Sequence, residues 1–173
     1  MFLGLDLGTS GLKALLVNEN ETIVAEAVAP LQVTRPHDGW SEQNPDDWFT
    51  ACAAAIAGLG VDLSDVRGIG LSGHMHGATL IGRDGHALRA CMLWNDTRAS
   101  VEAAEMDADP IWRDVTGNIV FPGFTAPKVE WARRNEPAVF AQIDKVLLPK
   151  DALRLWLTGD AVSEMSDAAG TSW

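Results

Sequence analysis

The stretch that decides the fold is Phe2-Leu3-Gly4-Leu5-Asp6-Leu7-Gly8-Thr9-Ser10-Gly11-Leu12-Lys13-Ala14-Leu15-Leu16-Val17. Two apolar runs, 2–7 and 12–17, flank a short turn that is rich in glycine and hydroxyl residues, and this pattern predicts a β-hairpin. Asp6 places one carboxylate near the end of the first strand, where burial of its charge would be costly without compensation. The hairpin is therefore either a plain bend or part of a binding site.

The turn Gly8-Thr9-Ser10-Gly11 can direct several backbone N–H groups at one anion. Asp6 and Lys13 add a carboxylate and a cation beside it, a combination that suits a metal-bound phosphate. The turn is not a Walker loop, because the Gly-x-x-x-x-Gly-Lys spacing is absent. An ordinary hairpin is the alternative, since Gly, Ser and Thr are common turn residues.

Composition narrows the class of protein. The chain has 173 residues, 47% of them hydrophobic, which is enough for one domain with a sizeable core. Its net charge of −11 disfavours nucleic acid and anionic membranes as partners. Two cysteines are too few for a disulfide framework, and Cys52 is expected to be a reduced, buried thiol. There is no signal peptide pattern and no apolar run that could span a bilayer, so we expect a cytoplasmic protein.

The rest of the chain predicts an α/β fold. A third strand at 22–29 extends the hairpin to an antiparallel meander, and Asn44 and Pro45 begin a helix whose apolar stripe runs to Leu59. Further predicted elements are a strand at 66–71, a hairpin of 78–81 with 87–93, helices beginning at 96 or 97, 110, 127 and 137, a strand at 146–148, a helix that Gly159 ends, and a last strand at 161–165. This order favours a mixed sheet with helices packed on it.

Two later loops carry polar residues at strand ends. His74-Met75-His76 lies between Gly73 and Gly77 and has three interpretations: solvated histidines, a metal site without a convincing third ligand, or a polyol site. In the polyol site His76 would hydrogen-bond a hydroxyl while Met75 packs against carbon.

In the second loop, Trp94 could lie against the apolar face of a sugar while Asn95 and Asp96 bind its hydroxyls. The alternative puts Trp94 in the core and Asp96 at a helix cap, paired with Arg98. Lys150 and Asp151 are expected to begin a helix as a surface ion pair of little energetic value.

Taken together, these segments resemble the N-terminal region of the FGGY carbohydrate kinases. The matching segments span the chain in the family's order, at residues 4–13, 40–43, 72–78, 93–96, 116–118, 121–128, 147–151 and 166–171. The Gly-His-Met-His-Gly stretch is similar to that of the members that phosphorylate D-xylulose. The resemblance implies a ribonuclease-H-like, actin-type fold, with a mixed sheet and antiparallel meander flanked by helices. It implies transfer of the γ-phosphoryl group of ATP to the 5-hydroxyl of D-xylulose, with Mg²⁺.

The resemblance also implies roles for residues. Asp6 would organise the metal, the phosphates would lie at Gly8, Thr9, Ser10 and Gly11 with Lys13 nearby, and the sugar would contact Met75, His76, Trp94, Asn95 and Asp96. The family's general base is an aspartate in a Gly-Gly-Asp-Asn type of segment that does not occur in residues 1–173, and Asp167 is no substitute for it.

The expected organisation is an N-terminal sugar-binding domain over residues 1–173, incomplete at its C-terminal end and lacking the ATP-binding domain, and inactive by itself. The alternatives are a sibling kinase for another ketose or polyol and a non-catalytic sugar-binding module. The expected partners are a small sugar and ATP, and a homodimer is the assembly considered.

Overall fold

The computed structural model describes all of residues 1–173, which form two compact units. Unit 1 consists of residues 1–33 and 46–74, and unit 2 consists of residues 34–45 and 75–173. No helix in the chain is long and apolar enough to cross a membrane.

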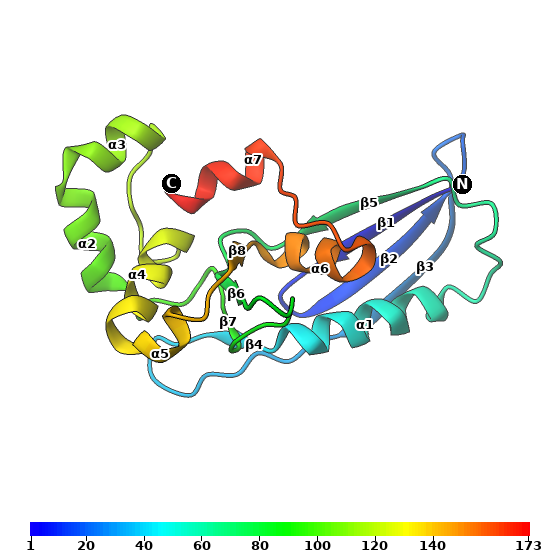
Figure 1. Cartoon of the computed structure of the whole chain (residues 1–173). Coiled ribbons are helices and arrows are strands. Elements are labelled where there is room, and N and C mark those ends of the chain that lie inside the picture. Colours follow the sequence, from blue (N-terminus) through cyan, green and yellow to red (C-terminus); the bar gives the residue numbers. More distant parts are fainter. The chain divides into compact units, whose positions relative to one another are not determined.

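Unit 1 is built on a four-stranded mixed sheet. Its strands are β1 (Phe2–Leu7), β2 (Gly11–Val17), β3 (Ile23–Pro30) and β5 (Gly68–Gly73), arranged in the order β3-β2-β1-β5. The first three strands are antiparallel, whereas β5 runs parallel to β1 (Figure 1). The predicted meander is therefore confirmed, and the parallel strand makes the sheet mixed.

Helix α1 (Pro45–Gly58) lies along one face of this sheet (Figure 1). Alternate residues of β1 and β2 are leucine or alanine and are buried, because a strand presents every second side chain to the same face. On the helix, Trp48, Cys52 and Ala55 are buried at helical spacing. Cys52 is a free thiol whose burial raises its pKa to about 11, as expected for a structural cysteine.

Unit 2 combines two short antiparallel strand pairs with most of the helices. Strand β4 (Glu42–Gln43) pairs with β7 (Cys91–Met92), and β6 (Thr79–Ile81) pairs with β8 (Lys145–Leu147). The helices are α2 (Ser100–Ala108), α3 (Pro110–Thr116), α4 (Thr125–Asn135), α5 (Pro137–Phe140), α6 (Pro149–Thr158) and α7 (Met165–Ala168), followed by a 3₁₀ turn, η1 (Ala169–Thr171). Ala78, Leu80, Met92 and Ala132 form a fully buried core in this unit.

The predicted last strand at 161–165 is wrong. Residues 160–164 form no regular element, and α7 begins at Met165. The side chain of Glu164 caps this helix by accepting hydrogen bonds from the backbone N–H groups of Ser166 and Asp167. The cap satisfies N–H donors at the start of the helix, which have no partner within the helix.

The predicted hairpin of 78–81 with 87–93 forms only in part. The turn closes through the Gly82 N–H, which donates to the His86 carbonyl at 2.9 Å, but β6 forms its ladder with β8 rather than with the second arm. The strand pairing within this unit thus depends on a segment more than 60 residues downstream of the turn's first arm.

Two helix starts also differ from expectation. Helix α2 begins at Ser100, so neither of the predicted caps, Asp96 and Thr97, caps it. Ala99 takes the cap position without a side-chain hydrogen bond, and the Asp96 carboxylate binds Ser41 and Arg98 instead. Helix α4 begins at Thr125, two residues before Pro127. In contrast, Asp109 caps α3 and Gly159 ends α6 in the left-handed conformation, as predicted.

Candidate functional site

The predicted phosphate residues lie together on the β1–β2 hairpin of unit 1. Asp6 is exposed near the end of β1, directly across the ladder from Lys13 on β2. Because Asp6 faces solvent, its charge carries none of the desolvation cost that burial in an apolar strand would impose. The carboxylate is therefore accessible to a ligand.

Backbone groups of the turn are used in hydrogen bonds within unit 1. The Gly8 N–H donates to the Gly11 carbonyl at 3.0 Å and closes the hairpin. The Ser10 carbonyl accepts from the Leu31 N–H at 3.0 Å, which ties the turn to the end of β3. Lys13 forms an ion pair with Glu26 at 2.9 Å, in which both side chains are about half exposed, so a bound phosphate would have to compete for it.

His74 and His76 have different environments. His74 is buried in unit 1, edge-on to Trp48 with ring centroids 5.7 Å apart. His76 belongs to unit 2 and adopts a left-handed backbone with φ of 63°, which is uncommon for a residue other than glycine. No group of three or more His, Cys, Asp or Glu side chains could hold a metal ion, so the metal interpretation of this loop finds no third ligand.

The ring of His76 is held between two segments of unit 2. It lies against the Phe124 ring, with centroids 4.6 Å apart. Gly170 lies on it so closely that a Cβ atom at position 170 would overlap the imidazole. Burial lowers the pKa of His76. The Gly170 backbone opposes this shift, and the charges of Lys128 and Asp167 have smaller effects that lower and raise the pKa, respectively. A neutral imidazole can both donate and accept a hydrogen bond.

Lys128 is the residue of this site whose role the sequence reasoning missed. It lies in the first turn of α4 and is fully buried, and its Nζ donates to the carbonyls of His76 at 3.0 Å and Gly123 at 2.6 Å. Burial lowers its pKa to about 8. The available signal was the segment Thr125-Ala126-Pro127-Lys128, which puts a lysine at a helix start, where the helix dipole disfavours a cation.

Trp94, Asn95 and Asp96 lie on one loop but in different environments. Trp94 is 44% exposed, so its placement in the core is wrong. The Oδ1 atom of Asn95 is buried without a hydrogen-bond partner in the chain, which leaves an acceptor for a ligand hydroxyl. Gly123 lies so close to the Trp94 carbonyl that a Cβ atom would not fit between them. Residues 121–124 therefore contact both the His76 ring and the Trp94 backbone.

Asp96 is completely buried and has both carboxylate oxygens occupied. One oxygen accepts from the Ser41 N–H and from Arg98, each at 2.6 Å, and the other accepts from the N–H and Nε of Arg98. Arg98 also pairs with Glu42 at 2.7 Å, and its guanidinium lies 3.6 Å from the centre of the Trp40 ring. The predicted pairing of Asp96 with Arg98 is confirmed, but Asp96 caps no helix.

The expected surface ion pair of Lys150 and Asp151 is wrong, since both residues are buried. The Nζ of Lys150 lies 2.8 Å from Asp151 and 3.0 Å from Asp167, so it links α6 to α7. Although burial opposes its charge, hydrogen bonds to these two carboxylates raise the pKa of Lys150. This cluster anchors the segment that carries Gly170.

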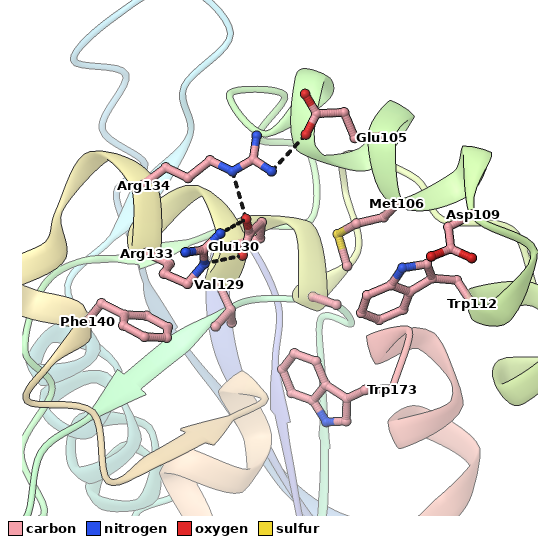
Figure 2. A pocket seen from close by; sticks show the side chains of 11 residues that line it. Glu105, Met106, Asp109, Trp112, Val129, Glu130, Arg133, Arg134, Phe140 and Trp173 are labelled. Carbon is pink, nitrogen blue, oxygen red and sulfur yellow. Dashed lines mark hydrogen bonds and ion pairs between the residues drawn. The ribbon is translucent and has the colours of Figure 1, made fainter.

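A separate cavity of about 460 Å³ lies among α2, α3 and α4 of unit 2. Figure 2 shows its apolar walls, which include Trp112, Val129 and Trp173, beside an ion-pair network in which Arg134 bridges Glu105 and Glu130 at 2.7 Å. None of the predicted phosphate or sugar residues lines this cavity.

Comparison with known proteins places this geometry in a family. The model of the FGGY family of carbohydrate kinases, N-terminal domain, matches residues 1–173. The xylulose kinase of Klebsiella pneumoniae is 51% identical over 176 residues, which cover all of this chain and 36% of that relative. The chain thus spans about a third of the length of this relative.

Solved structures agree with the fold. A protein from Brucella ovis described as a xyloylose kinase is 61% identical and has a TM-score of 0.96. The match covers 99% of this chain and 37% of the Brucella ovis chain. A gluconate kinase from Lactobacillus acidophilus is 26% identical and has a TM-score of 0.91. This match covers 99% of this chain and 36% of the gluconate kinase chain. The predicted actin-type α/β fold is therefore confirmed, and the chain belongs to the FGGY family of carbohydrate kinases, whose N-terminal domain it matches.

Proposed function

We propose that this chain is part of a kinase that transfers the γ-phosphoryl group of ATP to the 5-hydroxyl of D-xylulose. The observation that carries the proposal is the 51% identity, over the whole chain, to the xylulose kinase of Klebsiella pneumoniae. The gluconate kinase match shows that a nearly identical fold serves another substrate, so the sugar must be argued from the side chains rather than from the fold.

The β1–β2 hairpin supplies the phosphate part of the site. The donor chemistry fits Mg²⁺, because Asp6 offers one exposed carboxylate and Mg²⁺ in nucleotide enzymes keeps several waters and needs only one or two carboxylates plus phosphate oxygens. Asp6 would hold the hydrated ion, which neutralises charge on the phosphates when bound. The hydroxyls of Thr9 and Ser10 and the ammonium of Lys13 would bind phosphate oxygens, Lys13 after leaving Glu26.

The loops of unit 2 supply the sugar part. His76 presents a neutral imidazole, Met75 is 45% exposed and can pack on carbon, and Asn95 has a free acceptor. The exposed Trp94 ring offers an apolar face to C–H groups. We assign Asp96 to holding this loop rather than to direct sugar contact, because both of its oxygens are occupied within the chain.

No residue of this chain is assigned as the general base. Asp167 is the nearest candidate by sequence pattern, but it forms an ion pair with Lys150 at 3.0 Å. This ion pair engages the Asp167 carboxylate within the chain.

The test is a phosphorylation assay of the complete gene product against D-xylulose, D-ribulose, gluconate and glycerol. We expect D-xylulose to have the highest kcat/KM. His76→Ala should raise the KM for the sugar by about tenfold or more while the KM for ATP stays within about twofold, since the imidazole contacts only the sugar. Equal use of all four substrates, or an unchanged sugar KM in His76→Ala, would refute the assignment.

A further inference from the structure

The carbonyl of His76 is the point where the candidate sugar loop is fastened. It accepts hydrogen bonds from the Lys128 ammonium at 3.0 Å and from the Thr125 hydroxyl at 3.2 Å. Both donors come from the first turn of α4. His76 has a left-handed backbone, which is strained at a residue other than glycine and persists only where surrounding contacts impose it.

The same ammonium also fastens the loop at residues 121–124. Its 2.6 Å hydrogen bond to the Gly123 carbonyl fixes the loop that places Phe124 against the His76 ring and abuts the Trp94 backbone. One buried cation therefore determines the position of a proposed sugar-binding side chain from two directions, through its backbone and through the surface that supports its ring.

The buried ammonium of Lys128 lowers the stability of the folded state. Lys128 is fully buried, and both of its hydrogen bonds go to main-chain carbonyls rather than to a carboxylate. Burial without a directly bonded counter-ion is unfavourable, and the helix start adds an adverse dipole. An apolar side chain of similar length would fill the space at lower cost, so packing alone does not account for a lysine here.

We propose that Lys128 is a positioning residue for sugar binding, whose ammonium holds His76 and the 121–124 loop in the geometry that receives the substrate. This inference rests on the proposed function, because it takes His76 to be a sugar ligand. Lys128 itself touches no substrate, since it is fully enclosed by the chain.

The experiment compares kinetic constants of the complete gene product in three forms: wild type, Lys128→Met and Lys128→Gln. Methionine keeps all but the last atom of the side-chain length and removes the ammonium that makes both hydrogen bonds, whereas glutamine supplies neutral N–H donors. We expect Lys128→Met to raise the sugar KM about tenfold or more, because small misplacements of a binding group have large effects, with ATP KM and kcat changed by less than about threefold. Lys128→Gln should recover part of the loss.

Lys145→Met is the matched control. It removes a lysine that is about half exposed and pairs with Asp144 at the surface, so its kinetic constants should equal those of the wild type. If Lys128→Met does not fold, Thr125→Val removes one donor to the same carbonyl without changing charge, and should raise the sugar KM about threefold. The inference would be overturned if the sugar KM did not change. It would also be overturned if the sugar KM and the ATP KM rose, and kcat fell, by the same factor.

A second measurement separates this inference from the proposed function. The imidazole NMR signals of His76 report its position without any substrate. They should shift in Lys128→Met and Thr125→Val and stay unchanged in Lys145→Met, whichever sugar the protein phosphorylates. Unchanged His76 signals in the first two variants overturn the positioning role, whereas a wild type that phosphorylates no sugar overturns the proposed function.

Discussion

The stability of this protein should rise with pH in the alkaline range because of Lys128. Burial lowers the pKa of this ammonium to about 8, whereas the same group in the unfolded chain titrates near 10.5. Between these values the unfolded state binds one proton more than the folded state, so the free energy of unfolding increases with pH. Below pH 8 the folded state carries the whole penalty of the buried charge, and above 10.5 it carries none.

The size of the effect follows from the two pKa values. Lowering a pKa from 10.5 to about 8 corresponds to roughly 3 kcal/mol, because each tenfold change in the acid constant is worth about 1.4 kcal/mol. The groups that act on Lys128 electrostatically are Cys91, Asp96 and Arg98, and it acts in turn on His76. The Cys91 thiol stays protonated through most of this range, since burial raises its pKa to about 11.

The assay is urea unfolding of wild type and Lys128→Met at several pH values from 7 to 10.5, followed by tryptophan fluorescence. All other titrating groups are common to the two proteins, so the difference between their unfolding free energies isolates Lys128. We expect that difference to change by roughly 3 kcal/mol in favour of the wild type as the pH rises. Parallel stability curves would show that the ammonium is not desolvated in the folded state and would refute the reasoning.

Three further substitutions test other parts of the site. Asp6→Asn should lower kcat about 10²-fold with little change in the sugar KM, because the carboxylate is proposed to hold the metal; near-normal turnover in a steady-state assay would rule this out. Gly170→Ala should displace the His76 imidazole and raise the sugar KM about tenfold, which the same assay measures and an unchanged KM would contradict. Arg98→Met leaves Asp96 as a buried, unpaired charge, so urea unfolding should show a loss of about 3–5 kcal/mol; a loss below 1 kcal/mol would mean that water reaches the carboxylate.

Local sequence patterns predicted unit 1 well because its structure depends on local rules. The β1–β2 hairpin and β3 follow from alternating apolar residues and turn residues, and α1 begins at a proline followed by two aspartates. The parallel pairing of β5 with β1 is a long-range contact, but the expected fold class already required a mixed sheet.

Unit 2 was harder to predict because its elements depend on partners far away in the sequence. Strand β6 pairs with β8 instead of completing the local hairpin, and the predicted strand at 161–165 gives way to a helix capped by Glu164. The local pattern around Lys150 is that of an ordinary helix start, and only the fold brings Asp167 to within 3.0 Å of its ammonium. The burial of Lys150 cannot be recognised from the local sequence, which is why a surface ion pair was predicted.

The residues around His76 break several local rules at once, and this supports their assignment to function. His76 is left-handed without being glycine, Lys128 is a buried cation at the positive end of a helix, and Gly170 lies where any side chain would collide with the imidazole. Each feature is unfavourable by itself, and a chain selected only for stability would replace the lysine with an apolar residue. All three act on the position of one imidazole ring. The simplest physical account is that the geometry of this ring contributes something other than stability, and contact with a substrate is the role that fits the proposed function.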